Sequence, residues 1–335
     1  MLRVPYPDLL DVLLRATTAL GLSGDRAALC ARIFAEATRD GVASHGINRF
    51  PRFARQVAEG VVDVAAEPEC REALGALERW SGNAGVGILN AWQSMDRAIV
   101  LARTHGIGCV ALADTNHWMR GGTYGWQAAD TGMIGVCWSN SMPNLPPWGG
   151  VDARLGNNPL VIAVPRAEGH VVLDMAVSQF SYGALESHAR AGKRLPVPGG
   201  YDRTGALTDD PAALAETGRI LPIGYWKGSG LSLALDLVAS LLSGGRSVSR
   251  IEPDPIRETG LSQVFIAIAP ERLGGNPEVV VDDAIAFMKA SEPVDSTTAI
   301  RYPGERTLQI RHENEQRGVP VDPSVWGEVR LLAGY

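Results

Sequence analysis

The 335-residue sequence lacks the short motifs that mark several common classes of enzyme. No G-x-G-x-x-G follows an early strand-like segment, and the glycine cluster at 82–87 has a different spacing. The patterns G-x-x-x-x-G-K-[ST], G-x-S-x-G and H-E-x-x-H are also missing. We therefore expect no standard Rossmann phosphate loop, P-loop, hydrolase nucleophile elbow or helical zinc-protease site.

Cysteine is scarce as well. Cys30, Cys70, Cys109 and Cys137 are far apart in the sequence and form no C-x-x-C pair. This spacing argues against a disulfide framework and against a zinc knuckle. Reduced thiols are typical of the cytosol, so we expect a cytoplasmic protein.

The sequence has no excess of basic residues and no clean apolar run long enough to cross a membrane. It contains 31 basic and 37 acidic residues, a net charge of -6, which favours neither nucleic acid nor an anionic membrane as partner. The uncharged run at 131–151 is interrupted by prolines and glycines, which disfavour a transmembrane helix. The N-terminal segment is interrupted by Asp8 and Asp11, and we predict a helix there with no export signal.

Helical and strand-like segments instead alternate along the chain, which is typical of an α/β protein. We predict helices at 7–38 (as two), 44–60, 82–106, 179–192, 224–245, 277–293 and 307–332. Strands are predicted at 76–80, 107–115, 133–139, 159–165, 170–176 and 263–270. The helix at 224–245 is apolar on nearly all faces, so we expect it to be buried on several sides.

The stretch at 116–150 concentrates the side chains that line small-molecule pockets. It holds four of the eight tryptophans, interleaved with polar residues that include Asn116, Arg120 and Asn140. Ligand pockets are largely apolar and aromatic, with a few directed polar groups. We interpret this stretch as one wall of a site; the alternative is a packed core with polar turn formers.

Ser44-His45-Gly46 followed by Arg49 is the sharpest candidate for chemistry. On a helix His45 and Arg49 would share one face, where the histidine could protonate a carbonyl while the arginine anchors a neighbouring carboxylate. The alternative is a surface turn with a solvated arginine. We expect the nearby Arg52 and Arg55 to be solvated helix residues.

His117 directly follows the strand predicted at 107–115, a position where sheet proteins often present catalytic groups. It could be a second acid/base or a hydrogen-bond donor to substrate, or a structural histidine. A metal site made from His45, His117 and Asp114 has no diagnostic spacing, and we expect none. Lys227 before a glycine-serine-glycine helix start could mark an anion site, or the glycines could be a flexible cap.

At these residues the chain resembles the malate/L-lactate dehydrogenase-like NAD(P)-dependent oxidoreductases, a family distinct from the Rossmann enzymes of the same names. The resemblance rests on GVASHGINRFPRF, HGIGCVAL, NHWMRGGTYGWQAAD, CWSNSMPNLPPWGG, GNNPL, LDMAVSQFSYGALE, LPIGYWKGSGLSLALDL, SQVFIAIAPERL and VDPSVW. These motifs are long and cover nearly the whole chain in order.

The resemblance implies a non-Rossmann α/β (α+β) fold of the L-sulfolactate/malate dehydrogenase type, and a homodimer. In such a fold residues 73–306 form a mixed-sheet domain that binds cofactor and substrate. Residues 1–72 and about 307–335 form a helical domain from both chain ends.

The resemblance also implies NADH as cofactor, with NADPH possible. The implied contacts are His170, Val171, Val172, Leu173, Asp174, Met175, Ala176, Trp226, Lys227, Gly304, Glu305 and Arg306.

The implied activity is reduction of a 2-oxo or diketo sugar acid, with 2,3-diketo-L-gulonate as the expected substrate. His45 is the implied proton donor, with His117 as the alternative, and Arg49 the implied carboxylate ligand. The implied substrate-binding residues are Ser44, Arg49, Asn116, Arg120 and Asn140.

Two other functions stay open from the sequence. The chain could reduce another 2-oxo acid, of the malate, lactate or cyclic imino acid type, or bind a sugar acid without catalysis. Some relatives carry a lysine where this chain has Ser139, Asn140 and Ser141, and that departure favours the diketo sugar acid.

Overall fold

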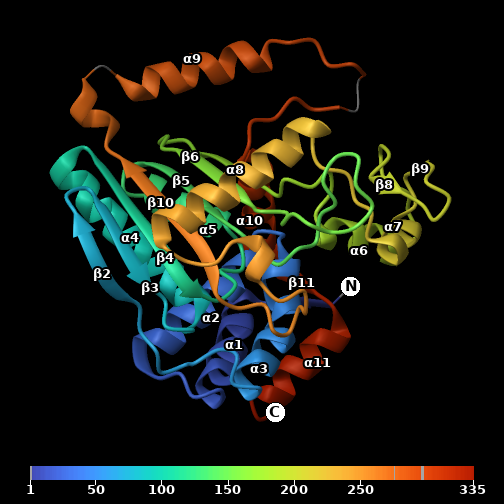
Figure 1. Cartoon of the computed structure of the whole chain (residues 1–335), viewed down its shortest axis with the longest axis horizontal. Helices are drawn as coiled ribbons and strands as arrows, with labels where there is room; N and C mark the ends of the chain where they lie inside the picture. Colours follow the sequence, from blue (N-terminus) through green and yellow to red (C-terminus); the bar gives the residue numbers. More distant parts are fainter. Residues whose placement is uncertain (1, 275, 296–297) are drawn as a thin grey trace.

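The structure, a computed structural model, describes residues 2–274, 276–295 and 298–335 (Figure 1). Its α-helices are α1 (Tyr6–Ala19), α2 (Gly24–Arg39), α3 (Phe50–Ala58), α4 (Gly87–His105), α5 (Gly122–Ala129), α6 (Tyr182–Arg190), α7 (Pro211–Thr217), α8 (Trp226–Ser243), α9 (Pro277–Lys289), α10 (Glu305–Arg317) and α11 (Pro323–Leu332). Its strands are β1 (Leu2–Val4), β2 (Glu69–Leu74), β3 (Leu77–Ser81), β4 (Ile107–Thr115), β5 (Ile134–Ser139), β6 (Leu160–Val164), β7 (Val171–Met175), β8 (Gly200–Tyr201), β9 (Leu207–Thr208), β10 (Leu261–Ile268) and β11 (Val319–Val321).

Seven strands form one mixed sheet in the order β2-β3-β4-β10-β5-β6-β7. The pair β3 and β4 is parallel, whereas the other neighbouring pairs of this sheet are antiparallel. The late strand β10 lies between β4 and β5, with Phe265 opposite both Val110 and Cys137. The mixed-sheet α/β fold predicted from the sequence is confirmed.

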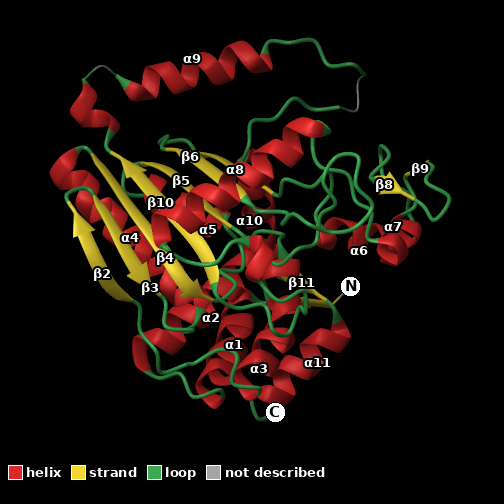
Figure 2. Ribbon diagram, viewed as in Figure 1, coloured by secondary structure: helices red, strands yellow, loops and turns green. Residues whose placement is uncertain are grey.

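Helices cover both faces of the sheet (Figure 2). Because side chains alternate along a strand, Val110 and Leu112 of β4 pack against α4 and α5, while Ala111 packs against α8. On β10 the same alternation places Phe265 on the face covered by α4 and α5 and Val264 on the face covered by α8. The sheet is therefore a rigid central layer, and the loops at its ends can position side chains.

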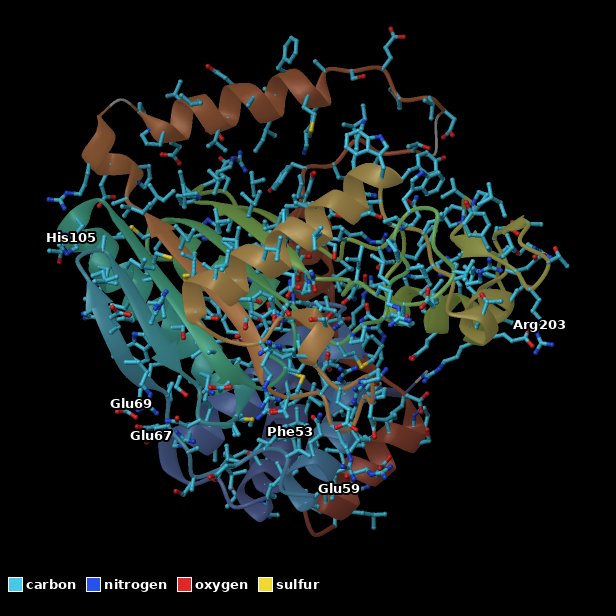
Figure 3. All side chains as sticks on the ribbon, viewed as in Figure 1. Phe53, Glu59, Glu67, Glu69, His105 and Arg203 are labelled. Carbon is cyan, nitrogen blue, oxygen red and sulfur yellow. The ribbon has the colours of Figure 1, made fainter. Side chains whose placement is uncertain are left out.

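Both ends of the chain meet in a helical layer below the sheet (Figure 1). Strand β1 pairs antiparallel with β11, and α11 packs on α1. The core of this layer includes Phe34, Phe50 and Phe53, whose ring centroids lie 5.1 to 5.8 Å apart. Figure 3 labels Phe53 in this layer. The division into domains at 72/73 and 306/307 stays a prediction.

Helix α8 differs from the prediction that it is buried on several sides. It packs on β4, β5 and β10 with one face only, and Leu233, Leu237 and Leu241 are 47%, 47% and 73% exposed. Helix α9 lies at the edge of the molecule and has no buried side chain among its described residues (Figure 1). Ion pairs of Asp282 with Arg166 and of Lys289 with Glu305 link it to the rest of the chain. Within one chain these two helices therefore leave apolar side chains in contact with solvent.

Several elements were not predicted, namely β1, β2, α5, α7, β8, β9 and β11. The single helix predicted at 307–332 is divided into α10 and α11 by β11, which pairs with β1. Strand β2 is an exposed edge strand with a polar sequence, so it carries no apolar alternation to identify it. Helix α7 has only seven residues within a turn-rich segment. No helix among the described residues has both the length and the apolarity to cross a membrane.

Candidate active site

A cleft of about 940 Å³ opens between the helical layer and one end of the sheet. The segment between α2 and α3 contributes His45 and Arg49, and the loop after β4 contributes His117 and Arg120. Strand β7 and the turn before α10 form the opposite wall with Asp174 and Gly304. Residues that are far apart in the sequence thus face one space.

The Ser44-His45-Gly46 segment folds as two 3-10 turns, η1 (Ala43–His45) and η2 (Ile47–Arg49), whereas the sequence predicted an α-helix. The Thr38 hydroxyl donates to the carbonyl of Phe34 (2.7 Å) and accepts from the Ile47 N–H (2.8 Å). A Cβ on Gly46 would lie 2.2 Å from the Thr38 oxygen, so this close approach requires glycine. The turns still bring His45 and Arg49 to the cleft.

His45 and His117 stack against each other across the cleft wall, with ring centroids 5.7 Å apart and planes inclined by 21°. Burial and the nearby charges of Arg49 and Arg120 lower the pKa of His45 to about 4. Burial also lowers the pKa of His117, together with Arg49, His45 and Arg52. At neutral pH both imidazoles are therefore uncharged in the ligand-free cleft.

The two histidines differ in their hydrogen bonds. The N–H of Met119 donates to Nδ1 of His117 (3.0 Å), and because a backbone N–H can only donate, the ring proton of neutral His117 is on Nε2. Nδ1 of His45 lies 3.2 Å from the Ser44 hydroxyl, which can donate or accept. His45 can thus gain a second proton without losing its partner, whereas His117 cannot.

Arg49 and Arg52 both line the cleft and both face Glu258. Their guanidinium groups lie 3.8 and 3.7 Å from the buried Glu258 carboxylate. The prediction that Arg52 is solvated was wrong, because α3 turns it onto the 255–258 segment, where its Nε donates to the carbonyl of Pro255 (2.9 Å). The three-residue spacing of Arg49 and Arg52 was the one sequence feature that could have placed Arg52 beside Arg49 in the cleft. No feature of the sequence indicated Glu258.

Arg120 is almost fully buried and is held by a carboxylate behind the cleft. Its Nη1 donates to Asp40 at 2.6 Å, and Arg311 donates to both Asp40 oxygens at 2.9 and 2.8 Å. Arg39 makes a fourth contact with Asp40, at 3.0 Å. Burial alone would raise the pKa of Asp40, but the hydrogen bond from Arg311 and the charges of Arg120, Arg311 and Arg39 lower it to about 2.

This depressed pKa predicts a pH-dependent contribution of Asp40 to stability. The folded value of about 2 lies below the ordinary 3.8, so the contribution is present above about pH 4 and is lost as the pH falls towards 2. Its size is on the order of 2 kcal/mol. Urea unfolding of wild type and Asp40→Asn should show a stability difference that shrinks by this amount between about pH 5 and pH 2. A pH-independent difference would contradict it.

Two predicted substrate ligands have side chains that are occupied within the protein. Asn116 donates to the carbonyls of Ala84 (2.7 Å) and Gly85 (2.8 Å) and does not line the cleft. Asn140 lines the cleft, but its amide donates to Asp236 (2.9 Å) and to the carbonyl of Arg246 (2.7 Å). Both amides brace the loops that carry the site.

The residues predicted to contact the cofactor are only partly brought together. Val172, Leu173, Asp174, Ala176 and Gly304 line the cleft, and the N–H of Val172 donates to Pro303 (2.8 Å). The residues outside its lining are His170, Val171, Met175, Trp226, Lys227, Glu305 and Arg306. Trp226 is 67% exposed at the start of α8. The β7 wall and the Gly304 turn are thus the part of the prediction that shares the cleft with the histidines.

This wall has the chemistry that a nicotinamide dinucleotide needs. Asp174 faces the cleft and accepts from the Gly122 N–H (2.8 Å) with one carboxylate oxygen. Desolvation raises the pKa of Asp174, against the lowering effects of Arg120 and Gly122. Gly304 has a φ of 100°, and a Cβ there would lie 2.9 Å from the carbonyl of His170, so this tight turn favours glycine.

The chain is similar to known proteins over its whole length. The profile of the malate/L-lactate dehydrogenase family matches residues 4–330. The 2,3-diketo-L-gulonate reductase of Citrobacter koseri is 45% identical over 333 residues, which are 99% of this chain and 100% of that protein. The enzyme of the same name from Salmonella enteritidis is 44% identical over the same shares.

Solved structures share the fold. Sulfolactate dehydrogenase from Methanocaldococcus jannaschii superimposes with a TM-score of 0.91 at 27% identity, covering 99% of this chain and 97% of that one. Δ1-Piperideine-2-carboxylate reductase from Pseudomonas syringae gives a TM-score of 0.86 at 28% identity, covering 99% and 100%.

Proposed function

The chain belongs to the malate/L-lactate dehydrogenase family and is an oxidoreductase, and on that premise we propose that it reduces 2,3-diketo-L-gulonate with NADH. The observation that carries the proposal is that His45, His117 and Arg49 face one cleft together with Asp174. A proton donor, a carboxylate ligand and a cofactor wall in one space are what reduction of a 2-oxo acid requires. The relatives named 2,3-diketo-L-gulonate reductase support the choice of acid.

His45 is the proposed proton donor. Its hydroxyl partner, Ser44, tolerates both protonation states of the ring, whereas the Met119 N–H keeps His117 neutral. Neutral His117 carries its proton on Nε2 and is proposed to donate a hydrogen bond to the substrate. The nicotinamide supplies the hydride when bound, and the protein's own part is to orient the carbonyl and deliver the proton.

Arg49 is the proposed ligand of the substrate carboxylate. Its guanidinium has one distant ion pair, to Glu258 at 3.8 Å, and lines the cleft. Binding of a carboxylate there would offset the positive charge that lowers the pKa of His45. Substrate binding is therefore expected to raise the pKa of His45. A larger fraction of the imidazole is then protonated and can donate a proton to the substrate.

This coupling predicts a specific pH profile for reduction. Because free His45 has a pKa of about 4 and must be protonated to donate, kcat/KM should fall with rising pH throughout the neutral range. The pH at which kcat begins to fall should lie about one unit or more above the corresponding pH for kcat/KM. The reason is that Arg49 is paired with the substrate carboxylate in the enzyme–substrate complex. Steady-state rates measured across pH in both reaction directions check this, because oxidation needs neutral His45, which already predominates at neutral pH, so kcat/KM for oxidation should be independent of pH in this range. A kcat/KM for reduction that rises with pH would contradict it.

NADH is the proposed cofactor in preference to NADPH. A carboxylate in a dinucleotide site accepts hydrogen bonds from ribose hydroxyls and repels a 2′-phosphate. Asp174 is the acidic side chain that the β7 wall presents to the cleft. Trp226, Lys227, Glu305 and Arg306 stay predicted contacts on the basis of the family resemblance.

The proposed assembly is a cytoplasmic homodimer. The exposed leucines of α8 and the 87% exposed Phe287 of α9 support it, because exposed apolar surfaces can mark subunit interfaces.

The test of function is a steady-state panel of keto acids with NADH and with NADPH. The proposal expects the highest kcat/KM for 2,3-diketo-L-gulonate with NADH. A higher value for pyruvate, oxaloacetate or a cyclic imino acid would favour the other 2-oxo acid reductases. Binding of sugar acids with no NADH oxidation would favour a non-catalytic role.

A further inference from the structure

One buried carboxylate organises three arginines behind the cleft. We call Asp40, Arg39, Arg120 and Arg311 the Asp40 cluster. Asp40 ends α2, Arg120 precedes α5 and Arg311 lies on α10, so the cluster joins the helical layer to the sheet at the cleft. The Asp40 side chain is 2% exposed, and its contacts with the three arginines lie between 2.6 and 3.0 Å.

The arginines of the cluster differ in their other partners. Arg39 also pairs with Glu315 at 3.4 Å and lies over the ring of Tyr6. Arg311 binds both oxygens of Asp40 and lies 4.7 Å from the ring of Trp126. Among the described residues, the carboxylates within ion-pair distance of these three arginines are those of Asp40 and Glu315. Two negative charges therefore face three positive charges, and one positive charge is not neutralised.

The geometry assigns that charge to Arg120. Its Nη1 is used by Asp40, whereas its buried Nε has no hydrogen-bond partner. Nε and Nη2 form the edge of a guanidinium that binds two oxygens at once. Arg120 lines the cleft and is 5% exposed, so an unpaired donor here is costly unless a ligand fills it.

We propose that Asp40 is a positioning residue that holds Arg120 with its Nε–Nη2 edge available as a site for a ligand oxyanion. The oxyanion has two possible sources, the carboxylate of the keto acid and a phosphate of the dinucleotide. Both sources are considered because Arg120 lines the same cleft as His45 and Asp174. The inference rests on the proposed function only for the identity of these two ligands.

Binding measurements test the role without any need for turnover. The variants are Asp40→Asn and Glu78→Gln, titrated with NADH by fluorescence and with oxalate by calorimetry. Asp40→Asn should weaken one of the two probes by about 10–100-fold, the scale of a lost charged hydrogen bond. Glu78→Gln is the matched control, because it likewise removes a buried carboxylate that holds an arginine, Arg97 at 2.6 Å, but outside the cleft lining. It should bind both probes like wild type.

The two probes distinguish the source of the oxyanion. A loss confined to oxalate assigns the substrate carboxylate, and a loss confined to NADH assigns a cofactor phosphate. The wild type could bind a probe, and Asp40→Asn could weaken that binding, although the wild type reduces no keto acid. In that case the proposed function fails while the role of Asp40 stands.

Chemical rescue gives a readout that a merely structural role would not move. Arg120→Ala should lose the same affinity as Asp40→Asn and should regain part of it with millimolar guanidinium chloride. The double variant Arg120→Ala/Asp40→Asn should show no rescue, because nothing holds the added guanidinium. Asp40→Glu, which shifts the carboxylate by one methylene, serves in place of Asp40→Asn if that variant does not fold.

Four results would overturn the proposal. These are wild-type affinity of Asp40→Asn for both probes, equal losses in Asp40→Asn and Glu78→Gln, rescue of the double variant, and a wild type that binds neither probe.

Discussion

His45→Ala is expected to lower the turnover of keto-acid reduction by about 10²–10⁴-fold while NADH binds nearly as in wild type. The reason is that the ketone oxygen must gain a proton as the hydride arrives, and His45 can carry that proton. Neutral His117 stays in place but has its Nδ1 blocked by the Met119 N–H, so it replaces His45 poorly. Single-turnover kinetics with preformed NADH complex measure the effect directly.

His105→Ala is the control for this substitution. His105 is an exposed histidine at the end of α4, outside the cleft lining (Figure 3). Its removal should leave turnover unchanged. Turnover of His45→Ala within a few-fold of wild type, with a large loss in His117→Ala, would move the proton-donor role to His117.

Arg49→Lys should lower kcat/KM for the keto acid by about 10²-fold, mostly through KM. Lysine keeps the charge but loses the planar fork that matches a carboxylate. The lysine ammonium would also lie at a different distance from His45 than the guanidinium does, and Arg49 helps to lower the pKa of His45. Steady-state kinetics with saturating NADH give the two constants separately.

Arg55→Lys is the matched control, since Arg55 lies on α3, which begins directly after Arg49, but is exposed and pairs with Glu59 at 2.7 Å. It should behave as wild type. If Arg49→Lys left KM unchanged, the carboxylate would have to bind elsewhere, and Arg52, Arg120 and Arg190 are then the arginines of the cleft to test.

Most of the long helices and strands could be predicted because their sequences carry a local pattern, whereas short elements such as α5, α7 and β11 could not. The apolar run at 107–115 coincides with β4, and the runs at 133–139, 159–165 and 170–176 contain β5, β6 and β7. His45 and Arg49 could be singled out for the same reason, since their chemistry is visible within five residues. The long motifs that these segments share with relatives also predicted the family, which the comparisons confirm.

The long-range arrangement could not be predicted in this way. Insertion of β10 between β4 and β5 depends on pairing between segments more than a hundred residues apart. Asp40 meets Arg120 and Arg311 across 80 and 271 residues of chain, and no local spacing announces such a contact. The burial of α8 was overestimated because apolarity on all faces does not tell whether the second face meets the same chain or another.

The most direct test of the central claim is transfer of the label from NADH deuterated on the nicotinamide ring to 2,3-diketo-L-gulonate. The account predicts that wild-type protein consumes NADH and acid in equal amounts and places deuterium on the carbon next to the carboxylate. Arg49 and His45 would hold the acid in that orientation. Bound NADH that stays unoxidised in the presence of this acid, or deuterium found at another carbon, would contradict it.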